Sequence, residues 1–162
     1  MLKSITAALI SIAAIASVEA AEAPAADAHA ITHPGDVASA QGPATIFTGR
    51  VRTDSISRPD ANSQYSMTNV TFEPGARTFW HTHPAGQRMV VTFGKGLVGT
   101  EKEVRVIRAG DVVWCPPNVK HWHGAAPDTA MVHIAVTNVK DGKNVTWLEA
   151  VSDEDYQKTP ND

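Results

Sequence analysis

Five histidines between positions 81 and 133 are the side chains whose type and spacing most favour chemistry in this chain. Four of them form two pairs, His81 with His83 and His121 with His123, with one residue between the members of each pair. Successive side chains of a strand alternate between its two faces, so each pair presents two imidazoles on one face. A buried imidazole needs partners for both ring nitrogens, and a missing partner costs free energy. Coordination of a metal ion supplies such partners, so the pattern predicts a metal centre.

Short strand-like runs separated by turn-forming residues surround these histidines from about Ala44 onward. Many short strands with regular turns favour an antiparallel sandwich or barrel, so we expect an all-β fold. Pro74-Gly75 and Gly94-Lys95-Gly96 are among the predicted turns, and a short helical segment is expected at residues 152–158. The predicted strands cover residues 45–52, 66–72, 78–83, 87–93, 104–108, 111–114, 120–123, 130–139 and 145–148.

The first histidine pair resembles the first motif of the cupin family. That motif has a Gly, five residues, His-x-His, three or four residues, a Glu, six residues and a second Gly. The chain keeps this spacing and departs only in having Gln in place of Glu. The matching residues are Gly75, His81, His83, Gln87 and Gly94.

The second pair resembles the second cupin motif, which has a Gly, five residues, Pro-x-Gly, two residues, a His, three residues and an Asn. Gly110, Pro116 and His121 meet this pattern, while Asn118 stands in place of its second Gly and Ala125 in place of its final Asn. The two motifs together are far more specific than a single His-x-His. The resemblance implies a cupin jelly-roll β-barrel, an antiparallel two-sheet sandwich with a metal inside.

Residues 44–157 as a whole look like the bacterial manganese-dependent cupin-fold hydroxynitrile lyases and their uncharacterised relatives. The sequence HWHG at residues 121–124 and a histidine on a later strand, here His133, are features of that group. The resemblance implies a divalent metal, Mn²⁺ first, with Fe²⁺, Ni²⁺ or Zn²⁺ as alternatives. It implies four metal ligands: His81, His83, Gln87 and His121.

The glutamine ligand decides which chemistry the centre favours. Three imidazoles and an amide oxygen leave the full double charge of the ion in place, which favours Lewis-acid chemistry over a higher oxidation state. Gln87 cannot accept a proton, so the base must be another side chain. His123 and His133 are the predicted proton carriers, because imidazole titrates near neutrality. His123 shares a face with His121 but is expected to stand away from its coordination position. The alternative for both is a hydrogen-bonding role that orients the ligands.

A small, mostly apolar pocket is expected beside the metal, formed by side chains that share the strand phase of Gln87 and His133 or lie on a neighbouring strand. Plain core packing is the alternative for these residues. The predicted pocket residues are Thr68, Val70, Met89, Val91, Ala135 and Thr137. Trp80 and Trp122 alternate with the histidines, so we expect them to face away and to pack. The single cysteine, Cys115, is expected to be buried.

The N-terminal part of the chain reads as an export signal. Lys3 supplies a positive charge, the run ITAALISIAAIASV follows at residues 5–18, and Val18-Glu19-Ala20 is a plausible cleavage site. We therefore expect a signal peptide at 1–20, a disordered Ala/Pro-rich leader at 21–43, a domain at 44–157 and a tail at 158–162. The expected location is the periplasm or the outside of the cell.

The formal charge of −3 is spread without runs of like charge, which argues against nucleic acid as a partner. It equally argues against membrane binding once the signal is removed. Small molecules and copies of the chain itself remain as partners. The resemblance implies a homodimer or homotetramer, and the exposed edges of a sandwich of short strands also favour association.

The favoured function is a metal-dependent carbon–carbon lyase of the hydroxynitrile lyase type, which reversibly cleaves cyanohydrins to an aldehyde and hydrogen cyanide. Two alternatives use the same scaffold: a metal-dependent cupin dioxygenase, and a non-enzymatic cupin that binds a ligand. Gln87 argues moderately against the dioxygenase, because a neutral ligand only shifts a redox potential.

Overall fold

The structure, a computed structural model, describes residues 28–33, 35–158 and 160. The predicted signal peptide at 1–20, leader residues 21–27 and tail residues 159, 161 and 162 lie outside the described residues. In the described part, no helix has the length and apolar character needed to cross a membrane.

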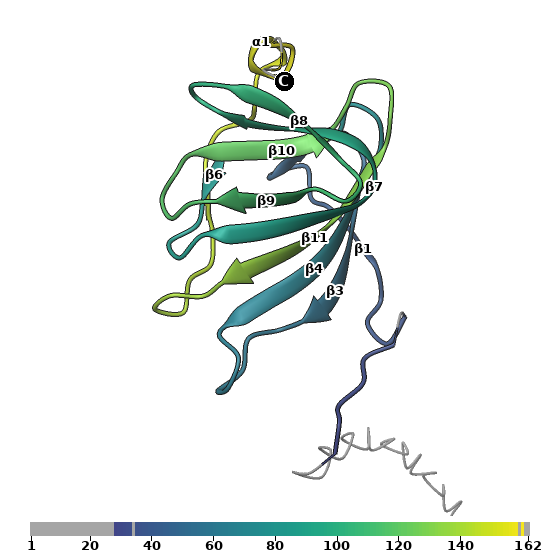
Figure 1. Cartoon of the computed structure of the whole chain (residues 1–162), viewed down its shortest axis with the longest axis vertical. Coiled ribbons are helices and arrows are strands. Elements are labelled where there is room, and N and C mark those ends of the chain that lie inside the picture. The colour runs from purple at the N-terminus through teal and green to yellow at the C-terminus, as the bar shows by residue number, and fades with distance from the viewer. Residues whose placement is uncertain (1–27, 34, 159, 161–162) are drawn as a thin grey trace, which may run out of the picture. The chain divides into compact units, whose positions relative to one another are not determined.

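Antiparallel strands form two sheets that share the long strand β7 (Gln87–Thr100) and curl around a common interior (Figure 1). The first sheet has the order β1 (Ala40–Gln41), β3 (Val51–Ser57), β4 (Tyr65–Phe72), β11 (Met131–Asn138), β7 and β9 (Val112–Cys115). The second has the order β2 (Phe47–Thr48), β5 (Arg77–Thr78), β10 (His121–Ala125), β7 and β8 (Val104–Arg108), while β6 (His81–Thr82) joins β10 to β12 (Thr146–Trp147). The predicted all-β barrel is confirmed.

The strand predicted at residues 45–52 is wrong in its bounds. Two strands replace it, β2 and a longer β3 that continues to Ser57. Gly49 separates them with a φ of 80°, a left-handed conformation that glycine adopts readily. Upstream, Ala40 and Gln41 pair with β3, so ordered structure begins within the range predicted as a disordered leader.

The turn predicted at Gly94-Lys95-Gly96 is also wrong, because β7 runs through these residues into the second sheet. Gly94 has a φ of 75°, and the register between β7 and β11 shifts between Val132 and His133. A Cβ at Gly94 would collide with the carbonyl oxygen of Ala130. The shift leaves Thr92 unpaired in β11, and Gly94 follows this bulge at the point where β7 passes from one sheet to the other.

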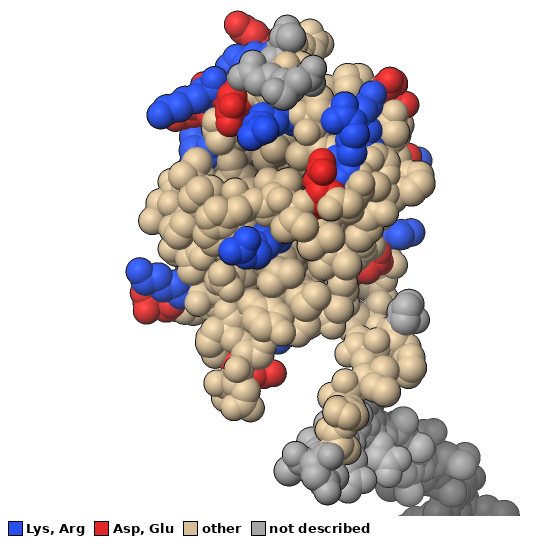
Figure 2. All heavy atoms as spheres, in the orientation of Figure 1, with Lys and Arg blue, Asp and Glu red and all other residues tan. Residues whose placement is uncertain are grey.

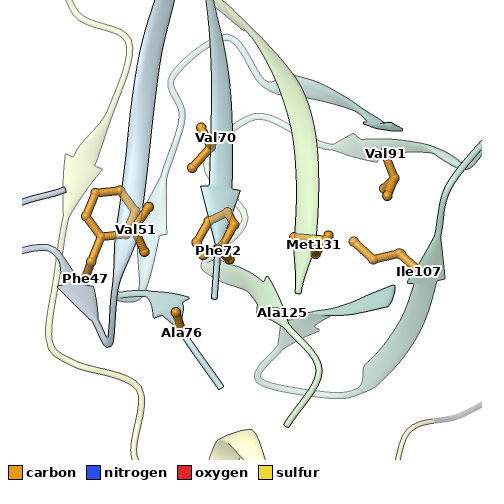
Figure 3. Close-up of a cluster of buried hydrophobic side chains, with 9 residues drawn as sticks. All are labelled: Phe47, Val51, Val70, Phe72, Ala76, Val91, Ile107, Ala125 and Met131. Atoms are coloured by element: carbon orange, nitrogen blue, oxygen red, sulfur yellow. The ribbon is translucent and has the colours of Figure 1, made fainter. Parts of the chain in front are cut away.

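A hydrophobic cluster between the sheets supports the interior wall (Figure 3). Its members are Phe47, Val51, Val70, Phe72, Ala76, Val91, Ile107, Ala125 and Met131. Phe72 is fully buried, and burying such a side chain contributes on the order of 2 kcal/mol. Its ring centroid lies 5.9 Å from that of His123 and 5.5 Å from that of His133. The core thus fixes the position of both rings.

A second cluster confirms that Trp80 and Trp122 pack away from the histidines. They lie with Val151 and Tyr156, beside the short helix α1 (Asp153–Tyr156). This helix falls inside the segment predicted at 152–158. The expected burial of Cys115 is also confirmed, and burial raises the pKa of its thiol to about 12.

The outer face in view carries few charged side chains over β7, β9 and β11, whereas Lys, Arg, Asp and Glu gather towards β8 and α1 (Figure 2). Val90, Val112 and Trp114 are exposed on these strands. The expected homodimer or homotetramer stays a prediction.

Candidate metal centre

Three histidines meet because β6 pairs with β10. His81 lies directly opposite His121 in this pairing, and their ring centroids are 4.3 Å apart. His83 follows β6, and its ring centroid lies 5.0 Å from that of His81 and 5.2 Å from that of His121. All three side chains are buried. The structure thus brings together the imidazoles that the sequence predicted as ligands.

Each of these three rings uses its Nδ1 in the same way, by donating to a backbone carbonyl oxygen. The bonds run from His81 to Phe79 at 2.9 Å, from His83 to Asn144 at 2.6 Å and from His121 to Val119 at 2.8 Å. A carbonyl oxygen only accepts, so the proton of each neutral ring is on Nδ1. Each Nε2 therefore keeps its lone pair, which is the form that binds a metal.

Gln87 adds an oxygen to this set. Its Nε2 donates to Thr137 Oγ1 at 2.9 Å, which leaves Oε1 as the other end of the amide. Among the described residues, Gln87 Oε1 has no hydrogen-bond partner, and neither do His83 Nε2 and His121 Nε2. Buried polar atoms without partners are costly. A divalent cation accepts all three as ligands, and the lone pair on His81 Nε2 adds a fourth, so the four donors predicted from sequence fit a metal.

Burial holds the three rings in their neutral form. Desolvation, followed by the charge of the neighbouring His121, lowers the pKa of His81 well below its ordinary value. Desolvation likewise lowers the pKa of His83, against the hydrogen bond to Asn144, and lowers that of His121 to about 4. Protons therefore do not compete for Nε2 at neutral pH.

His123 lies close to two members of this set. One nitrogen from each of His81, His121 and His123 lies within 4.8 Å of the others. Strand alternation gives the face on which a side chain lies but not its distance from side chains on the neighbouring strand. The His81 ring centroid is 5.2 Å from that of His123. The ring centroids of His121 and His123 are 6.2 Å apart, and the expectation that His123 does not share the coordination position of His121 stays a prediction.

The second proton carrier predicted from sequence contacts the first. His133 Nε2 and His123 Nδ1 are 3.2 Å apart, so one nitrogen donates to the other. Both rings are buried. Desolvation, then the charge of His133, lowers the pKa of His123 well below its ordinary value, and desolvation lowers that of His133 to about 4. The two rings form a neutral, hydrogen-bonded pair behind the metal ligands.

A cavity of about 280 Å³ opens beside these groups. Four of the predicted pocket residues line it, Thr68, Val70, Ala135 and Thr137, together with His81, His83, Gln87, His123 and His133. The rest of its wall is Pro43, Ile46, Phe47, Thr53, Ser66, Thr78, Asn144, Val145 and Trp147. No Lys, Arg, Asp or Glu among the described residues lines it, so the cavity suits a small neutral molecule.

The prediction that Met89 and Val91 line the pocket is wrong. Both share the inward phase of Gln87, and both are buried. Val91, however, packs in the hydrophobic cluster with Ile107 and Met131, and neither residue reaches the cavity wall. Strand phase distinguishes inward-facing from outward-facing side chains. It does not distinguish inward-facing side chains that line the cavity from those that pack in the core.

Sequence reasoning missed the segment that closes the site from the C-terminal side. Asn144 contributes its backbone carbonyl to His83, and the Trp147 ring lies 4.8 Å from the His81 ring, centroid to centroid. Trp147 also lies against Phe47. The sequence did offer a signal for Trp147, which is an aromatic residue within the strand predicted at 145–148. A backbone contact such as that of Asn144 has no signature in side-chain type.

Comparison with known proteins agrees with this geometry. The family description "Cupin domain" matches residues 68–137. The chain is 51% identical over 125 residues to an (R)-mandelonitrile lyase from Granulicella tundricola, and the matched region covers 76% of this chain and 95% of that protein. A cupin-like protein from Thermotoga maritima is 41% identical with a TM-score of 0.70, covering 82% of this chain and 98% of that chain. A polyketide cyclase from Streptomyces resistomycificus, 16% identical with a TM-score of 0.61 over 80% of this chain and 92% of that chain, shares the fold.

The range matched to the family contains both histidine pairs, Gln87 and His133. The lyase from Granulicella tundricola is 51% identical over 76% of this chain. With its antiparallel barrel and its buried histidine cluster, the chain belongs to the cupin family.

Proposed function

We propose that this protein is a metal-dependent lyase that reversibly cleaves a small neutral cyanohydrin into an aldehyde and hydrogen cyanide. The observation that carries this proposal is an uncharged cavity beside four neutral donors, with a pair of neutral histidines at its wall. The reactant and the aldehyde are both uncharged, so nothing in the cavity needs to neutralise a substrate carboxylate or phosphate.

His81, His83, His121 and Gln87 would hold a divalent ion, with Mn²⁺ as the first choice. A bound ion supplies Lewis acidity and lowers the pKa of the substrate hydroxyl. Gln87 contributes to this effect because its amide is neutral and leaves the double positive charge of the ion undiminished. The remaining steps belong to side chains of the chain itself.

His123 accepts the hydroxyl proton of the cyanohydrin. The carbon–carbon bond then breaks, its electron pair leaves with cyanide, and the oxygen forms the carbonyl of the aldehyde. The same ring returns the proton to cyanide, which gives hydrogen cyanide. A pKa below the ordinary value suits this cycle, because His123 starts neutral and releases the proton readily. His133 holds the His123 ring through the 3.2 Å contact.

The relative from Granulicella tundricola, whose name states its activity on (R)-mandelonitrile, supports an aromatic cyanohydrin as the substrate. The apolar side of the cavity has side chains that suit a phenyl ring, among them Phe47, Val70 and Trp147. A cavity of about 280 Å³ has room for a substrate with one ring and a short substituent.

The test is synthesis of mandelonitrile from benzaldehyde and cyanide at mildly acidic pH, with metal-free protein and with protein reloaded with Mn²⁺. The reloaded protein should give one enantiomer in excess, and the metal-free protein should give the racemic background. His123→Ala should lower the rate about 10²- to 10⁴-fold while keeping the bound metal. His33→Ala, at an exposed histidine, is the matched control. Racemic product at the background rate from the reloaded protein would contradict the proposal.

A further inference from the structure

Thr137 lies directly opposite Gln87 in the pairing of β11 with β7. Its Oγ1 accepts the hydrogen bond from Gln87 Nε2 at 2.9 Å. Both side chains point inward and are buried, with exposed fractions of 6% for Thr137 and 5% for Gln87. A hydrogen bond in such surroundings is not weakened by competing water.

The two ends of an amide have opposite chemistry. The oxygen offers lone pairs, whereas the nitrogen carries two hydrogens and repels a cation. In this structure Nε2 is occupied by Thr137, and Oε1 is the end without a partner among the described residues. The Thr137 hydroxyl thus engages the amide nitrogen, and the oxygen, which is the end that a cation requires, stays without a partner among the described residues.

We propose that Thr137 is a positioning residue that fixes the Gln87 amide with its oxygen towards the metal ligands. This inference rests on the metal centre of the proposed function but not on the reaction. Thr137 acts through Gln87, and no other hydrogen bond holds the Gln87 amide nitrogen in the described part of the chain. Loss of the hydroxyl allows the amide to turn and weakens the hold on the ion.

The experiment measures the dissociation constant of Mn²⁺ from the full protein by competition with a chelator of known affinity. Thr137→Val, which keeps the shape but lacks an acceptor, should weaken binding about tenfold. Thr137→Ser restores an acceptor and should bind within about threefold of the unmodified protein. Thr92→Val is the matched control, because Thr92 lies exposed on the same strand as Gln87. Thermal unfolding of each variant checks that it is folded.

A thermodynamic cycle tests whether the effect passes through Gln87. In a Gln87→Ala background, Thr137→Val should leave the dissociation constant unchanged. An equal loss in both backgrounds, or no loss in the unmodified one, overturns the inference. Absence of Mn²⁺ binding to the unmodified protein overturns it together with the metal centre. A protein that binds Mn²⁺, shows the tenfold effect and cleaves no cyanohydrin would overturn the proposed function alone.

Discussion

At the scale of single residues, Gln87 sets the charge of the centre. Replacing it with a carboxylate, Gln87→Glu, lowers the net charge of the loaded site by one. The ion should bind at least as tightly, since an ionic ligand replaces a neutral one. The cleavage rate should fall about 10- to 100-fold, because the Lewis acidity falls. Metal affinity and steady-state kinetics on mandelonitrile check this.

Gln41→Glu supplies the control for that substitution, because Gln41 is exposed on β1. It should change neither the affinity nor the rate. A Gln87→Glu protein that binds Mn²⁺ and cleaves at the original rate would contradict the role given to the neutral ligand.

The sequence predicted which residues gather at the site, because a two-residue period places each histidine pair on one face. His81, His83 and His121 do lie together, although His83 follows β6 and lies outside a strand. The period says nothing about distance along the interior. It therefore put Met89 at a cavity wall that Met89 does not reach.

At the scale of elements, the strands at 66–72, 104–108 and 130–139 were predicted well. The strand predicted at 78–83 is wrong, because it is split into β5 and β6, and the two predictions next to Gly49 and Gly94 have the wrong bounds. Gly49 and Gly94 both have positive φ, yet the first separates two strands and the second lies within one. Their sequence signals are alike. They differ in their partners, since Gly94 pairs with Met131 of β11 and Gly49 lies between β2 and β3.

The backbone conformation and close packing of Gly94 give a prediction for stability. Gly94→Ala should lower the free energy of unfolding by about 2 kcal/mol or more, since it adds backbone strain at a φ of 75° and a collision with Ala130. Gly110→Ala tests strain alone, because its φ is 97° but a Cβ there meets no atom within 4 Å. It should cost about 1 kcal/mol. Urea unfolding measures the free energy of unfolding of both variants. Equal losses would contradict a contribution from the close approach of Ala130 to Gly94.

At the scale of the whole molecule, the buried histidines make the metal-free protein sensitive to acid. Their pKa values lie below the ordinary 6.5 in the folded chain, so the unfolded chain binds more protons between pH 6.5 and about 4. Stability is therefore full above pH 6.5 and falls as the pH drops towards 4. His133 alone, with a pKa of about 4, contributes about 3 kcal/mol to this loss.

Unfolding temperatures of the metal-free protein between pH 7 and pH 4 check this dependence. His133→Leu removes one of the groups and should make the decline shallower. A metal-free protein whose stability does not change between pH 6.5 and 4 would show that these rings are not held neutral by burial.

The most direct test of a metal-dependent lyase relates activity to bound metal. Metal-free protein is titrated with Mn²⁺, and the bound ion and the initial rate of (R)-mandelonitrile cleavage are measured on the same samples. The rate should rise in proportion to the bound ion and level off at one ion per chain. Full activity without metal, or a site filled with Mn²⁺ that releases no benzaldehyde above background, would contradict the proposed function.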